Sequence, residues 1–386
     1  ATHWYHDHGV HRTAYNAYSG LAGQYIVDDP DEVAGLPKTY GVDDFPLILS
    51  DKIFDNAGQL VFDETLVTSA GYHGDVILAN GVPWPSMTVE PKPYRFRVVS
   101  TGVSRAYNLF LSNGGTIQVI ATDGGLLEKA APTKNLRAGV SERYEIVIDF
   151  SLYAGQTLEL KNAGLKNHPD YLNTGKVMQF KVKSKLSAGV SYDKNAYNAA
   201  LAKLRKDSFN YTNRIAQLTA YGNANGGIVE RTMVFERKNG LWVINGNTWG
   251  DGVNPIEANP RPAGVEIWHL KNGGGGWNHP IHIHLVDFLL MSRTGGDSPG
   301  VRNYEQGFKD VTYLGEGEEI TVISIWGPHE GKYMFHCHNL IHEDDDMMRA
   351  FNVGGNGLEP VGTDGTSRTR GQGPYDAKPR GTRPAL

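Results

Sequence analysis

The sequence predicts an all-β protein built from consecutive β-sandwich domains, and three observations support this prediction. Short runs of β-branched and aromatic residues recur between turn signals along most of the chain. Glycine and tyrosine are abundant, at 47 and 19 residues, which is typical of many strands joined by turns. The length of 386 residues corresponds to two or three domains.

The elements expected at the start of the chain form only part of a domain. Residues 1–30 open within an apolar and aromatic strand, and residues 14–28 predict a pair of strands. Residues 31–44 are rich in Asp, Pro and Gly and are predicted to be a linker.

Two complete β domains are expected after this linker. The first covers residues 45–183 and the second residues 229–353, with a linker at 184–228 that includes a short helix near residues 195–206. The tail, 354–386, has almost no apolar anchors and is expected to be mobile unless a partner holds it.

Composition and charge exclude several classes of function. The net charge is −5 and the basic residues are scattered, so no nucleic acid partner is expected. No apolar stretch reaches 18 residues, so no membrane span is expected. Asn210-Tyr211-Thr212 is a glycosylation sequon in the second linker, which favours a secreted, extracellular glycoprotein.

Eight of the 14 histidines fall into three tight groups, and one group surrounds the only cysteine. Such a pattern indicates metal binding rather than packing. The histidines outside these groups, including His73 and His168, have no partner pattern and are interpreted as surface or packing residues. The groups are His6-Asp7-His8, His279 to His284, and His336-Cys337-His338 with His342.

Strand geometry separates these ligands into two sites. Residues two apart on a strand point to the same side, so His336 and His338 point together while Cys337 points the opposite way. We call the set His279, Cys337, His342 and Met347 the thiolate site; Met348 is the rival fourth ligand. Two imidazoles, a thiolate and a weak thioether are typical of a blue-copper centre. The remaining six, which we call the histidine cluster, are His6, His8, His282, His284, His336 and His338.

These motifs resemble three of the four copper signatures of multicopper oxidases, and the bilirubin oxidase and laccase branch in particular. The resemblance extends through Gly81-Val82-Pro83-Trp84-Pro85, Tyr94-Arg95-Phe96-Arg97, Trp277-Asn278-His279 and the run Glu343 to Met348. It implies cupredoxin-like Greek-key sandwiches: the last strands of a first domain in residues 1–30, then two complete domains.

The resemblance also implies a set of copper ions and their ligands. One type 1 copper is expected in the thiolate site, and one type 2 copper on His282. His6 and His338 would share one type 3 copper. The other type 3 copper would lie between the imidazoles of His8, His284 and His336.

The expected activity is oxidation of phenolic, aromatic amine or bilirubin-like substrates, one electron at a time, coupled to reduction of O2 to water. Glu343 and Asp7 are candidate proton donors, or carboxylates that orient an imidazole; the first role is favoured for Glu343 and the second for Asp7. Trp277 is a candidate electron entry residue, with core packing as the alternative.

The resemblance implies four His-x-His pairs, but the sequence contains three; the family's first-domain His-x-His-Gly pair has no counterpart here beside His6-Asp7-His8-Gly9. We therefore expect a separate N-terminal chain that supplies it, which would make the enzyme a heterodimer; a truncated chain is the alternative.

Two other functions stay open. One is an electron-transfer protein with only the type 1 site. The other is a metallo-oxidase for Fe, Mn or Cu, with Glu343 to Asp346 as a carboxylate patch.

Overall fold

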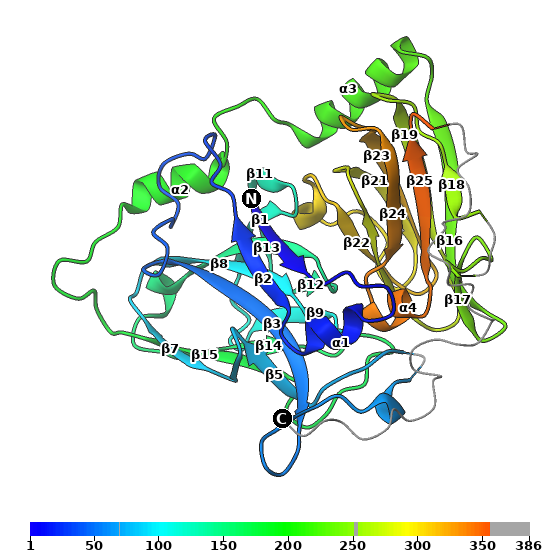
Figure 1. Ribbon diagram of the computed structural model, residues 1–386. Coiled ribbons are helices and arrows are strands. Elements are labelled where there is room, and N and C mark those ends of the chain that lie inside the picture. The colour runs from blue at the N-terminus through cyan, green and yellow to red at the C-terminus, as the bar shows by residue number, and fades with distance from the viewer. Residues whose placement is uncertain (69, 251–253, 356–386) are drawn as a thin grey trace.

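The computed structural model describes residues 1–68, 70–250 and 254–355. Strands dominate, and they form two β-sandwiches with a short ribbon at the N-terminus (Figure 1). The predicted all-β class is confirmed by these sheets. The tail discussed above lies outside the described residues from position 356 onward.

The N-terminal ribbon consists of β1 (Thr2–His6) paired antiparallel with β2 (Ala22–Ile26). The expected strand pair over residues 14–28 is wrong in its first half, where the chain forms helix α1 (Thr13–Tyr18). The apolar residues Ala14, Ala17 and Tyr18 are spaced as on one helix face, and that face packs on helix α4 (Leu340–Asp344). In Figure 1 the two helices lie side by side.

The middle domain contains two facing sheets around one apolar core. The first has the strand order β11-β10-β13-β8-β3-β5-β6, with β4 paired to β3, and the second has the order β12-β9-β14-β15-β7. Two short 3-10 helices, η1 (Glu64–Leu66) and η2 (Phe150–Tyr153), lie in its loops. The strands are β3 (Asp44–Phe54), β4 (Leu60–Val61), β5 (Val76–Ala79), β6 (Val82–Pro83), β7 (Ser86–Val89), β8 (Pro93–Ser100), β9 (Tyr107–Leu111), β10 (Ile117–Thr122), β11 (Gly125–Thr133), β12 (Leu136–Ala138), β13 (Arg143–Asp149), β14 (Thr157–Asn162) and β15 (Lys176–Val182).

Two helices, α2 (Lys194–Ala202) and α3 (Tyr211–Ala224), lie in the linker between the sandwiches. The first agrees with the expected short helix, and the second was not expected. Asn210 caps α3 by accepting a hydrogen bond from the Asn213 amide at 2.9 Å, and its side-chain nitrogen donates to Glu128 at 2.9 Å. The sequon asparagine is therefore held by two contacts in this structure.

The C-terminal domain also contains two facing sheets. It includes two of the three histidine groups, His279 to His284 and His336 to His342. Their strand orders are β17-β16-β19-β23-β21 and β18-β25-β24-β20-β22, and the 3-10 helix η3 (Asn303–Glu305) precedes β22. The strands are β16 (Val229–Lys238), β17 (Leu241–Ile244), β18 (Ile256–Ala258), β19 (Val265–Gly274), β20 (His279–Ile283), β21 (Leu289–Gly295), β22 (Val311–Leu314), β23 (Glu318–Ile325), β24 (Gly331–Cys337) and β25 (Met348–Val353).

Pairing between β20 and β24 positions the two motifs against each other. Ile281 is opposite Cys337, and His282 is opposite His336. Because side chains alternate along a strand, this register places histidines on one side of the sheet and the thiol on the other. Among the described residues, no helix is both long and apolar enough to cross a membrane.

Candidate metal centres

The thiolate site brings two imidazoles to one buried sulfur. Cys337 Sγ lies 3.5 Å from His279 Nδ1 and 3.6 Å from His342 Nδ1, and all three side chains are fully buried. Burial raises the pKa of the Cys337 thiol, so a bound cation is needed to hold it as the thiolate. Met347 is also fully buried and belongs to the same apolar cluster as Cys337.

The histidine cluster gathers residues from three distant parts of the chain. His336 Nε2 lies 3.4 Å from His8 Nε2 and 3.2 Å from His284 Nε2, so three ring nitrogens face one point. The His6 ring lies 5.0 Å from that of His338, and the His282 ring lies 5.9 Å from it, centroid to centroid. All six histidines therefore meet in one place, as the sequence predicts.

The other ring nitrogen of several cluster histidines has a protein partner. The Nδ1 atoms of His6 and His282 each lie 2.8 Å from a backbone carbonyl, that of Asp7 and that of Asp310 respectively. A ring N–H donated to a carbonyl fixes the tautomer, which leaves the lone pair of Nε2 free for a metal. Asp310 was not singled out from the sequence, because a backbone carbonyl gives no sequence signal.

Glu343 lies between two histidines of the cluster. Its carboxylate is 3.1 Å from His336 Nδ1 and 3.6 Å from His8 Nδ1, and the side chain is buried. Burial alone would raise the pKa of Glu343, but His336 and the neighbouring imidazoles lower it to about 2. The position allows both roles considered from the sequence, so proton donation by Glu343 stays a prediction.

Asp7 contacts its own loop. Its carboxylate accepts hydrogen bonds from the Gly9 amide at 3.1 Å and from the Asn16 side chain at 2.8 Å, and the bond from Asn16 is the main cause of its lowered pKa. These contacts hold the turn between β1 and α1, which carries His8. A direct role of the Asp7 carboxylate on an imidazole stays a prediction.

One aromatic ring, that of Trp242, connects the thiolate site to the half-buried side chain of Trp277. The Trp242 ring stacks on that of His342 with centroids 3.8 Å apart, and Trp277 meets Trp242 edge-on at 6.3 Å. Trp242, on β17, was missed in the sequence because a single tryptophan on a strand has no distinguishing pattern.

The acidic run from Glu343 to Asp346 does not form an open patch at its start. Glu343 and Asp344 are 4% and 1% exposed. The Asp344 carboxylate accepts hydrogen bonds from the amides of Thr13 and Ala14, which begin helix α1. These two carboxylates are therefore engaged within the protein.

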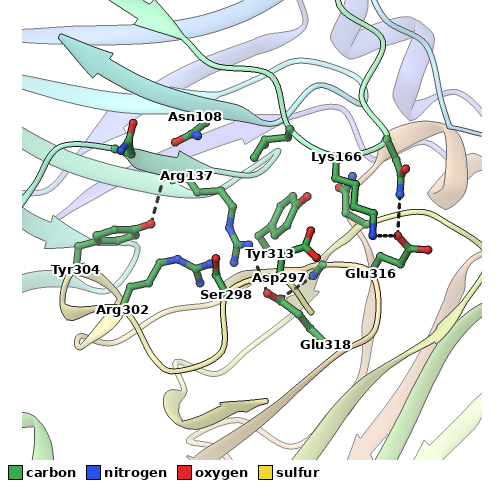
Figure 2. Close-up of a pocket in the computed structure, with 15 residues that line it drawn as sticks. Asn108, Arg137, Lys166, Asp297, Ser298, Arg302, Tyr304, Tyr313, Glu316 and Glu318 are labelled. Carbon is green, nitrogen blue, oxygen red and sulfur yellow. Dashed lines mark hydrogen bonds and ion pairs between the residues drawn. The ribbon is translucent and has the colours of Figure 1, made fainter. Parts of the chain in front are cut away.

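A polar cavity of about 260 Å³ lies between the two sandwiches (Figure 2). Its charged groups pair across the domains: Arg137 lies 3.5 Å from Glu318, and Lys166 lies 2.8 Å from Glu316. The Tyr304 hydroxyl accepts a hydrogen bond from the Arg137 amide at 3.4 Å. These contacts join the middle domain to the C-terminal domain.

The donor sets of the two sites fit copper. A thiolate with two imidazole nitrogens at these separations can share one ion, and a soft sulfur ligand beside imidazoles favours copper. The second group, His8, His284 and His336, also offers ligand atoms that all lie within 4.8 Å of one another. The fold and the two sites thus define the class: a copper protein built from β-sandwich domains.

Comparisons with known proteins extend this conclusion. The family model "Multicopper oxidase" matches residues 220–356. The chain is 44% identical to bilirubin oxidase of Albifimbria verrucaria over 367 residues, which cover 91% of this chain and 60% of that protein. It is 32% identical to a laccase of Bacillus subtilis (strain 168) over 376 residues, with coverages of 91% and 70%.

A solved structure agrees with these relatives. The McoA multicopper oxidase from Aquifex aeolicus superimposes with a TM-score of 0.77 at 30% identity, covering 92% of this chain and 75% of that one. The chain belongs to the multicopper oxidase family, a class of oxidoreductases.

Proposed function

We propose that the protein oxidises phenolic, aromatic amine or bilirubin-like molecules one electron at a time at the thiolate site and reduces O2 to water at the histidine cluster. One observation carries this proposal: Cys337 lies between His336 and His338, so the two sites share a continuous stretch of chain. Bilirubin oxidase and laccase, the names of the relatives above, support the choice of substrates.

Bound copper would supply the one-electron chemistry, and the protein supplies its geometry. The thiolate site, with Met347 as its fourth ligand, would hold a type 1 copper; His282 would hold a type 2 copper, and the rest of the histidine cluster would hold two type 3 coppers. Trp277 is the proposed entry for electrons, because its ring leads through Trp242 to His342. Glu343 is the proposed proton donor, because its carboxylate reaches two cluster histidines.

Replacing the only thiol tests this function directly. We expect the copper-loaded protein to absorb intensely in the visible range, and Cys337→Ser to lose both this absorption and phenol oxidation. His269→Gln is the matched control, because His269 contacts Thr321 and Glu230 and neither metal site. A Cys337→Ser protein that kept its colour and activity would overturn the assignment of the thiolate site.

We also propose that further imidazoles reach the cluster from a separate N-terminal polypeptide that carries His-x-His-Gly, so that the active enzyme is an extracellular heterodimer. The N-terminal ribbon supports this idea, because its sheet has only two strands among the described residues, fewer than an independent sheet needs. Tyr5 and Tyr25 on it are 65% and 61% exposed, which suits a surface that pairs with more strands.

Denaturing electrophoresis and N-terminal sequencing of the active enzyme test the second chain. We expect a second polypeptide of roughly a hundred residues, the size of one small domain. Binding of four copper ions and reduction of O2 to water by the 386-residue chain alone would show that the second chain does not exist.

A further inference from the structure

Two histidines outside both metal sites meet in a separate cavity. His73 lies in the loop before β5, and His168 lies in the loop between β14 and β15. Their ring centroids are 5.4 Å apart and their planes are perpendicular, at 89°. Both rings line a cavity of about 320 Å³, together with Ala70, Gly71 and Tyr171.

The nitrogen atoms of this pair are prepared for a ligand. His73 Nε2 and His168 Nδ1 are buried, and neither has a hydrogen-bond partner among the residues that the structure describes. Burial lowers the pKa of both rings, to about 4 for His168 and well below the usual value for His73. Both imidazoles are therefore neutral near neutral pH, which is the form that binds metals.

The spacing of the pair matches that of imidazoles assigned to a common metal ion. The rings of His279 and His342 in the thiolate site are 5.3 Å apart, and those of His284 and His336 in the cluster are also 5.3 Å apart. A separation of 5.4 Å thus allows His73 and His168 to share one ion.

A neighbouring asparagine can fix the tautomer of His168. The Asn278 side-chain amide lies 2.7 Å from His168 Nε2. A half-turn of this amide presents its oxygen to the ring N–H, which leaves the lone pair on Nδ1. Asn278 directly precedes His279, so the cavity also lies next to the thiolate site along the chain.

The surrounding charge favours a cation of low charge. The Arg105 guanidinium, which lowers the pKa of His73, is paired with Asp51 at 3.0 Å and with Asp170 at 3.2 Å. These carboxylates offset the charge of Arg105, and an ion of low charge meets less repulsion from the guanidinium than a divalent ion would.

We propose that His73 and His168 bind a Cu(I) ion as a substrate, at a site distinct from the thiolate site and the histidine cluster. Imidazole suits copper, and two neutral ligands satisfy the low coordination number of Cu(I). The proposal rests on the proposed oxidase function: each Cu(I) gives one electron to the thiolate site and leaves as Cu(II), with O2 as the final acceptor. It also assigns the metallo-oxidase activity to an imidazole pair in place of the acidic run at Glu343 to Asp346.

Anaerobic titration of the reduced, copper-loaded enzyme with Cu(I) against a competing chelator tests this site. We expect the wild type and His269→Gln to bind one additional Cu(I), and His73→Gln and His168→Gln to bind it at least about tenfold more weakly. The two variants lie on different loops, so the second still tests the site should the first fail to fold. Retained visible absorption of the oxidised variants shows that the thiolate site is intact.

The rate of Cu(I) oxidation provides a second readout. It should fall in both variants and stay unchanged in His269→Gln. Unchanged Cu(I) affinity in His73→Gln and His168→Gln would overturn the proposal. A wild type without visible absorption would instead contradict the proposed oxidase function, while the additional Cu(I) would still be measurable.

Discussion

At the scale of single residues, the ring nitrogen that faces the metal site differs between the thiolate site and the histidine cluster. In the thiolate site, Nδ1 of His279 and of His342 faces the sulfur. In the cluster, Nε2 of His8, His284 and His336 faces the proposed metal, while several Nδ1 atoms contact a carbonyl or the Glu343 carboxylate. In His6, His282 and His336 the partner on the far side of the ring therefore fixes which nitrogen faces the site.

Met347→Leu should raise the reduction potential of the thiolate site by tens of millivolts and leave the copper bound. The reason is that an axial thioether is a weak donor whose removal destabilises the oxidised ion. Potentiometric titration of the visible absorption measures the change. Met348→Leu is the matched control, and a shift in that variant in place of Met347→Leu would identify Met348 as the ligand.

Glu343→Gln should slow O2 reduction by roughly 100-fold, since it removes a proton donor. Anaerobic reduction of the visible chromophore by a phenol should keep its wild-type rate, because the thiolate site is unaltered. Stopped-flow absorption separates the two steps. Equal slowing of both would mean that Glu343 only orients His336 and His8.

At the scale of elements, the strands that carry the ligands were predictable and the packing that positions them was not. The His-x-His pairs and the lone cysteine indicate both sites, because alternation on a strand is a local rule. Helix α1 was predicted as a strand, since the acceptor of its first amides, Asp344, and the helix α4 on which it packs lie more than three hundred residues away in the sequence. The pairing of His73 with His168 was missed for the same reason: only the tertiary fold brings the two loops together.

Asp344→Ala should lower the free energy of unfolding by about 1 kcal/mol, because two buried amides at the start of α1 lose their acceptor. The turn that carries His8 is attached to α1, so copper content should fall as well. Thermal unfolding and metal analysis measure these effects. Asp28→Ala, at an exposed position, should change neither quantity, and a similar loss there would contradict the capping role.

At the scale of the whole molecule, a buried charge network joins the two sandwiches. Lys309 lies 2.9 Å from Asp123 and 3.3 Å from Glu142, and Arg143 Nη2 lies 2.5 Å from Asp310. The backbone carbonyl of Asp310 also contacts His282 Nδ1. The same residue therefore belongs to the interface between the domains and supports the histidine cluster.

Asp310→Asn should destabilise the protein by about 3–5 kcal/mol, because Arg143 then keeps a buried charge without its main partner. Burial raises the pKa of the Asp310 carboxyl, but Arg143 more than offsets this and lowers it. The lowered pKa means that the pair stabilises the fold above the unfolded value, about pH 4, and that this contribution is lost as the pH falls further. Chemical unfolding from pH 7 to pH 3 should show the variant and the wild type converging, and a constant difference would exclude the pair as its origin.

The short strand β24 has a consequence for how the enzyme can change over generations. Because the thiol and its flanking histidines are consecutive residues, covalent bonds, and not packing, set the length of the path between the two sites. Lengthening or shortening the chain by one position within β24 would exchange its two faces and turn the sulfur toward the imidazoles. Substitutions in β24 can therefore adjust electron transfer between the two sites, whereas insertions and deletions within the strand would separate the ligands and stop it.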